Sequence, residues 1–189
     1  QEWEEIRRPT SERTFQQEVA TALITLPSPD AAVELLARVR AASGDLVTGF
    51  ELMGRSCIAL AVERVPGTIH PFAEPSPYYA LIELSAGSSS GTLSGMLETA
   101  LGQAAEDGLV TDAVVANNAG QAQQMWRVRE AIPESQKIAG GGIKHDVSVP
   151  VSKVPDFIRE ASRVCEAELP GIRLFIFGHV GDGNVHFNL

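Results

Sequence analysis

Apolar and polar positions along the chain predict strands that alternate with amphipathic helices. Two strand–helix–strand units follow one another, at residues 19–26, 31–39 and 46–53, and at residues 78–84, 92–107 and 112–116. In the second of these helices, apolar residues recur every three or four positions, as on the buried face of a helix. The order predicts an α+β fold in which two ferredoxin-like strand–helix–strand halves share an antiparallel sheet with helices packed on it.

Proline, glycine and capping residues mark the ends of these elements. Either Ser28 or Asp30 can cap the first helix, and Gly44 is placed to end it. Residues 55–65 are predicted to be helical and residues 66–77 to form a proline-rich loop.

The second half of the chain begins with a long predicted helix over residues 119–139. Pro133 lies inside it and is expected to kink or split it, because proline lacks the amide hydrogen that a helix requires. A run of three glycines ends this helix. A strand over residues 143–150 and a helix over residues 155–169 are predicted to follow.

The last fifteen residues carry the most informative pattern, in which Asp182 and Gly183 lie between two apolar runs. Asp-Gly in this context indicates a two-residue type I′ hairpin turn. Counting outward from that turn places His179 directly opposite His186. Asn188 should lie on the same face, because side chains alternate along a strand.

Two imidazoles held on one face of a hairpin can bind a single divalent metal ion, although such ions usually take three or four ligands. The hairpin therefore predicts half of a metal site. The alternative interpretation is an ordinary polar pair of histidines on a solvated surface.

Composition narrows the possible functions. The net charge of −9 argues against a nucleic-acid-binding surface, which requires a basic stripe. Cys57 and Cys165 are far apart and form no CxxC motif, which favours reduced thiols in an intracellular protein. No apolar run approaches the roughly 18 residues of a membrane span, and residues 1–20 lack the apolar stretch of a signal peptide. We expect a soluble protein, cytoplasmic or peripheral at the inner membrane face.

Arg129 and Lys144 are candidates for binding an anionic substrate, because in an acidic chain the positive charge must be supplied locally. The alternatives are two surface cations, or an Arg129 that pairs with Glu130 or Glu134.

The other two histidines are assigned no chemistry. His145 should point to the opposite face of its strand from Lys144 and have a structural role. His70 is expected to be solvated in the proline-rich loop.

The run from His179 to His186 resembles the metal-binding signature of the flavin-dependent D-2-hydroxy-acid dehydrogenases and oxidases. This family includes D-lactate dehydrogenase, the glycolate oxidase flavin subunit and D-2-hydroxyglutarate dehydrogenase. The resemblance is to their C-terminal, substrate-binding cap domain. It covers residues 19–189 as a pattern and is specific at residues 126–150 and 178–188, whereas residues 1–18 are expected to be a lead-in, a linker or a tag remnant.

This resemblance implies roles for five residues. Substrate binding falls to Arg129, Lys144 and Asn188, and binding of a divalent metal, zinc or manganese, to His179 and His186. One departure concerns specificity, because several relatives have a substrate-binding threonine where this chain has a proline, one helical turn after the arginine.

The resemblance also implies FAD, bound mainly by an N-terminal flavin domain that this chain lacks. The expected partners are a small 2-hydroxy acid and an electron acceptor such as a quinone, a cytochrome or electron-transfer flavoprotein, with no nucleic acid. The family's catalytic base and third metal ligand are expected beyond Leu189, so the domain is expected to be truncated before its C-terminal end. We therefore expect the substrate- and metal-binding portion of a dehydrogenase that converts a D-2-hydroxy acid to the 2-oxo acid, inactive by itself.

Two alternatives belong to other functional classes. One is a non-enzymatic ferredoxin-like module that binds a small ligand or a partner and uses its histidines structurally. The other is a metal-dependent hydrolase, which is disfavoured because the sequence places no carboxylate base near the histidines. Metal content of the purified protein would separate the first alternative from the metal-binding interpretation.

Overall fold

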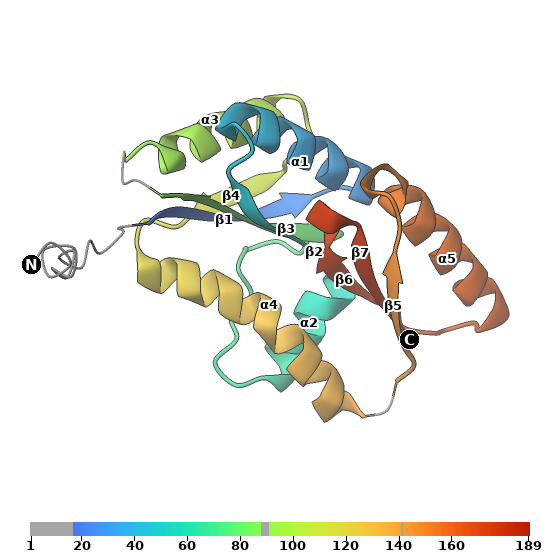
Figure 1. The fold of residues 1–189 in the computed structure, drawn as a ribbon. Helices are drawn as coiled ribbons and strands as arrows, with labels where there is room; N and C mark the ends of the chain where they lie inside the picture. Colours follow the sequence, from blue (N-terminus) through green and yellow to red (C-terminus); the bar gives the residue numbers. More distant parts are fainter. Residues whose placement is uncertain (1–16, 88–90, 141) are drawn as a thin grey trace, which may run out of the picture.

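The protein folds around a single antiparallel sheet. The computed structural model describes residues 17–87, 91–140 and 142–189. Within them, seven strands pair in the order β4-β1-β3-β2-β6-β7-β5, and every neighbouring pair is antiparallel (Figure 1).

The first half of the chain builds the ferredoxin-like part of the sheet. It contains β1 (Glu18–Leu26), α1 (Pro29–Ser43), β2 (Val47–Gly54), α2 (Arg55–Arg64), β3 (Tyr78–Ala86), α3 (Leu93–Glu106) and β4 (Asp112–Val115). The predicted α+β class and both strand–helix–strand halves are confirmed. The first strand begins at Glu18, and residues 1–16 of the predicted lead-in lie outside the described residues.

The second half widens the sheet beyond β2. It contains α4 (Ala119–Ala139), β5 (Lys144–Ser148), α5 (Val154–Glu168), β6 (Phe175–His179) and β7 (Asn184–Asn188). Two 3₁₀ turns, η2 (Val151–Lys153) and η3 (Val180–Asp182), connect these elements. Because β6 pairs with β2, the C-terminal hairpin lies directly beside the ferredoxin-like part.

Helices cover both faces of the sheet, so its central strands are buried on both sides. Along β1, Ala22 and Ile24 belong to the core formed with α1, α3 and α5, whereas Leu23 belongs to the core formed with α2 and α4. Figure 1 shows α1 and α3 on one side of the sheet and α2 and α4 on the other. Cys57 is a free thiol in the second core, where burial raises its pKa to about 12 and makes it unreactive.

Local chemistry accounts for the ends of the helices. The Ser28 hydroxyl accepts a hydrogen bond from the amide of Ala31, which identifies Ser28 as the cap of α1, and Gly44 ends that helix at φ 65°. Helix α4 continues through Pro133, so the predicted split does not occur. No helix in the described part of the chain is long and apolar enough to cross a membrane.

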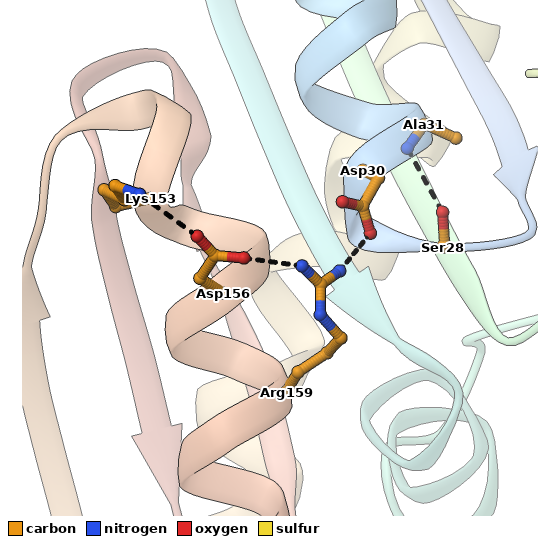
Figure 2. A network of polar contacts seen from close by, with 6 residues as sticks. All are labelled: Ser28, Asp30, Ala31, Lys153, Asp156 and Arg159. Carbon is orange, nitrogen blue, oxygen red and sulfur yellow. Dashed lines mark hydrogen bonds and ion pairs between the residues drawn. The ribbon is translucent and has the colours of Figure 1, made fainter.

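Exposed charges join α5 to α1 at the surface. Arg159 forms ion pairs with Asp30 and Asp156, and Lys153 pairs with Asp156 at 3.3 Å (Figure 2). Since more than half of each side chain is exposed, each pair contributes at most about 1 kcal/mol. The position of α5 therefore depends mainly on its apolar face, where Phe157 contacts Phe187 edge to face.

The C-terminal hairpin differs from its prediction. His186 of β7 lies opposite Phe177 of β6. His179 therefore lies two residues farther along β6 than the position opposite His186. A type I′ turn needs φ > 0 at both central residues, but Gly183 has φ 78° while Asp182 belongs to η3. The prediction that the two histidines are directly opposed is therefore wrong. The prediction that they share one face with Asn188 holds, because strand residues two positions apart point the same way.

Contacts with Val149, which directly follows β5, and a hydrogen bond within the turn accompany this wider turn. The amide of Val149 donates to the carbonyl of Gly183, and a Cβ at Gly183 would lie 2.0 Å from the carbonyl oxygen of Val149. The amide of Asn184 also donates to the Asp182 carboxylate at 3.0 Å. The chain thus turns over four residues, 180–183, and this turn packs against Val149, the residue that follows β5.

Gly178 should be required for the hairpin to form. Its φ is +153°, and a Cβ there would lie 2.5 Å from the carbonyl oxygen of Asn184. We expect Gly178→Ala to lower the free energy of unfolding by roughly 2–4 kcal/mol through backbone strain and overpacking, measured by urea denaturation. The control is Gly181→Ala, whose Cβ would meet only Phe50 at 3.9 Å. Equal stability of the two variants would contradict this prediction.

Candidate functional site

Polar side chains from four strands and from α4 gather on the sheet face beneath α4. Cross-strand register places Glu51 of β2 opposite His179 of β6, and Asp146 of β5 opposite His186 of β7. Arg129 reaches this face from α4. The structure thus brings both predicted metal ligands together with one of the predicted carboxylate-binding residues.

A buried carboxylate lies at the centre of this group. Glu51 is only 2% exposed, and its Oε2 accepts a hydrogen bond of 2.7 Å from Nε of Arg129. Its other oxygen contacts Nδ1 of His179. Arg129 therefore pairs with neither Glu130 nor Glu134, the acidic neighbours that the sequence offered.

The guanidinium of Arg129 also packs over an aromatic ring. Its Cζ lies 4.9 Å from the centroid of the Phe177 ring, a cation–π distance. Only Nε of Arg129 has a hydrogen-bond partner among the described residues. The two terminal nitrogens therefore remain available to a carboxylate.

His186 completes the group on the neighbouring strand. Its ring centroid lies 6.2 Å from that of His179 and 4.7 Å from that of Phe177. Its Nδ1 lies 3.2 Å from a carboxylate oxygen of Asp146. Partial burial lowers the pKa of the His186 imidazole, so that this ring is neutral at pH 7 and available as a ligand.

The donor set suits a divalent metal but is incomplete. No group of three or more histidine, cysteine, aspartate or glutamate side chains within the described ranges is arranged to hold a metal ion. Both imidazoles nevertheless have Nδ1 beside a carboxylate, and neither Nε2 has a hydrogen-bond partner among the described residues. This arrangement is typical of histidines that bind a metal through Nε2. The pair therefore fits as two ligands of a larger set.

Lys144 and Asn188 lie farther along the same face, opposite one another in the register. Both line a cavity of about 340 Å³ together with Gln136 at the end of α4. The amide nitrogen of Asn188 donates to Gln136 at 2.8 Å, and its oxygen accepts from the backbone amide of His145 at 3.2 Å. Asn188 is thus a buried part of the cavity wall, whereas Lys144 is exposed.

Two functional candidates were missed from the sequence, Glu51 and Asp146. A glutamate between Phe50 and Leu52 in β2 was the available signal, because buried acids are rare unless they are paired. A hydrolase was disfavoured because the sequence placed no carboxylate near the histidines. That premise is wrong, because the carboxylates of Glu51 and Asp146 lie beside His179 and His186. Both contact Nδ1 of an imidazole, as orienting groups do.

The remaining histidines lie outside this group. His145 points its ring to the backbone carbonyl of Phe187, with Nδ1 at 3.0 Å, which agrees with a structural role. The expectation that His70 is merely solvated is wrong, because its Nε2 lies 3.1 Å from the Tyr79 hydroxyl and its Nδ1 contacts the carbonyl of Phe72.

The buried ion pair predicts a large effect of Arg129→Ala. The substitution leaves the Glu51 carboxylate buried without its cation, so the free energy of unfolding should fall by about 3–5 kcal/mol in urea denaturation. Arg127→Ala is the matched control on the same helix. Among the described residues its exposed side chain donates only to the carbonyl of Pro66, and the expected change is within about 0.5 kcal/mol. Similar losses in the two variants would refute the buried pair.

Comparison with curated proteins identifies similar sequences. The chain is 38% identical over 158 residues to "Probable D-2-hydroxyglutarate dehydrogenase, mitochondrial" of Oryza sativa subsp. indica, covering 82% of this chain and 27% of that protein. It is 34% identical over 169 residues to D-2-hydroxyglutarate dehydrogenase of Xanthomonas citri pv. viticola, covering 88% of this chain and 34% of that protein. The chain thus spans about a quarter to a third of the length of these relatives.

Comparison with solved structures supports the fold. An alkyldihydroxyacetonephosphate synthase structure superposes with a TM-score of 0.55 at 11% identity, covering 91% of this chain and 35% of that one. This likeness concerns the fold alone. The family model for the C-terminal domain of FAD linked oxidases matches residues 15–189. The chain therefore belongs to the family of FAD linked oxidase C-terminal domains.

Proposed function

We propose that this chain is the substrate- and metal-binding part of a flavin-dependent dehydrogenase that oxidises a D-2-hydroxy acid to the 2-oxo acid. The family and the names of the relatives support the reaction class. The observation that carries the assignment to this sheet face is the grouping of two imidazoles, each with Nδ1 in contact with a carboxylate, with the guanidinium of Arg129.

The residues have separate tasks in this proposal. His179 and His186 would hold the metal through their free Nε2 atoms, while Glu51 and Asp146 keep the opposite ring nitrogens engaged. The two terminal nitrogens of Arg129 would bind the substrate carboxylate as a planar fork. When bound, the metal supplies Lewis acidity that lowers the pKa of the substrate hydroxyl, and FAD supplies the hydride acceptor.

Positioning of the substrate is the chain's main contribution to the reaction. A hydroxy acid held at its carboxylate and at its hydroxyl has little freedom to rotate, so its Cα–H bond keeps one direction toward the flavin. Lys144 adds a second, exposed positive charge on the same face, and the amide of Asn188 shapes the cavity beside it. The buried ring of Phe177 contacts both the guanidinium and the ring of His186, which restrains the spacing of these two groups.

The finer identities also belong to this proposal. D-2-hydroxyglutarate is the first substrate to test, because the relatives are named for it. The metal is zinc or manganese, since imidazole nitrogen suits zinc, and manganese accepts mixed nitrogen and oxygen ligands. A flavin domain, and a quinone, a cytochrome or electron-transfer flavoprotein as electron acceptor, complete the proposed system.

Zinc titration tests the metal half of the proposal. His179→Ala and His186→Ala should each abolish the binding of zinc measured by isothermal titration calorimetry, because each removes one of two imidazole ligands. His145→Ala is the matched control, since that ring lies on the other face and contacts a backbone carbonyl. Parent-like zinc binding by His186→Ala would place the site elsewhere.

The isolated chain should fold but not turn over. It corresponds to the C-terminal domain of longer relatives, so we expect purified protein to be colourless even after incubation with FAD. Dye reduction with D-lactate, glycolate or D-2-hydroxyglutarate should stay at the level of a protein-free blank. Turnover above that blank would overturn the assignment of the flavin to another domain.

A further inference from the structure

One carboxylate connects the two halves of the proposed site. Glu51 belongs to β2, whereas its partners come from α4 and from β6, so three elements meet at this side chain. Each of its oxygens has a different partner, Nε of Arg129 for one and Nδ1 of His179 for the other. No other described carboxylate is so deeply buried, with a side chain only 3% exposed.

We propose that Glu51 is a positioning residue that fixes His179 in the tautomer with a free Nε2 and holds Arg129 over Phe177. This inference rests on the proposed function and deepens it. Glu51 would keep the metal ligand His179 at a constant distance from the substrate-binding cation of Arg129.

Hydrogen-bond chemistry explains why a carboxylate is needed at this position. Ionised glutamate only accepts hydrogen bonds, so it can accept from Nε–H of Arg129 and from Nδ1–H of His179 at the same time. A neutral imidazole that donates through Nδ1 keeps its lone pair on Nε2, the atom that binds a metal. An amide in place of the carboxylate has one accepting oxygen and one donating nitrogen, so one of the two contacts would become donor against donor.

The second carboxylate, that of Asp146, should orient its histidine less firmly than Glu51 does. Asp146 has a side chain that is 67% exposed, and the oxygen that faces His186 also accepts from the amide nitrogen of Asn184 at 2.9 Å. Water competes for such a group, whereas the Glu51 side chain is only 3% exposed. The two histidines should therefore depend unequally on their carboxylates.

The first test compares three variants by zinc titration. Glu51→Gln should weaken zinc binding by about 10- to 100-fold, the usual effect of losing an orienting partner of a ligand. Asp146→Asn should weaken it less. Glu83→Gln is the matched control, because Glu83 lies on the adjacent strand and accepts from Nε1 of Trp126 in α4 at 2.8 Å without contacting either histidine. Unchanged binding in Glu51→Gln, or an equal loss in Glu83→Gln, would overturn the inference.

A second readout needs no metal and separates the two proposals. Long-range ¹⁵N–¹H spectra of the histidine rings, recorded where the imidazoles are neutral, report which ring nitrogen carries the proton. The parent and Glu83→Gln should show His179 protonated at Nδ1, and Glu51→Gln should show a shift toward Nε2. If this shift occurs while neither the parent nor any variant binds zinc, the metal assignment fails and the positioning role stands. An unshifted tautomer in Glu51→Gln contradicts the positioning role itself.

Folding of each variant can be verified by circular dichroism before either experiment. If Glu51→Gln does not fold, Glu51→Asp decides the question, because it keeps the charge but is one methylene too short to reach both partners. Its zinc affinity should also fall, and parent-like affinity in a folded Glu51→Asp protein would overturn the inference.

Discussion

A buried negative charge governs the arrangement of this site. An ionised carboxylate removed from water is strongly unfavourable unless a cation and hydrogen-bond donors compensate it. Glu51 lies inside the sheet between β3 and β6, so compensation must come from side chains that reach it across the face. Arg129 and His179 provide this compensation. Their positions therefore depend on their contacts with Glu51, which belongs to another element.

The architecture supplies these three groups from separate parts of the fold. The ferredoxin-like half provides Glu51, the added strands provide the two histidines, and α4 crosses over both parts to bring Arg129 onto Phe177. Pairing of β6 with β2 is the connection that matters most, because it joins the hairpin to the central sheet. The left-handed conformations of Gly178 and Gly183 then let the hairpin backbone pass close to its neighbours.

Sequence patterns predicted the elements well because alternation and helical spacing are local properties. The strands, the long helix and the shared face of His179, His186 and Asn188 all follow from such patterns. The hairpin turn did not, because its geometry depends on contacts with Val149 and on the pairing of β6 with β2, which no local pattern contains. The partner of Arg129 was equally hidden, since Glu51 lies 78 residues away in the chain. The nearer acids, Glu130 and Glu134, were the only candidates that spacing could suggest.

A crystal structure of the zinc-loaded protein, with anomalous scattering recorded at the zinc edge, would show whether His179 and His186 hold the metal. We expect an anomalous peak bound by Nε2 of both His179 and His186 at about 2.0–2.1 Å. Both Nδ1 atoms should still face Glu51 and Asp146. Zinc bound only at surface carboxylates, or bound through Nδ1 with these two contacts broken, would contradict this expectation.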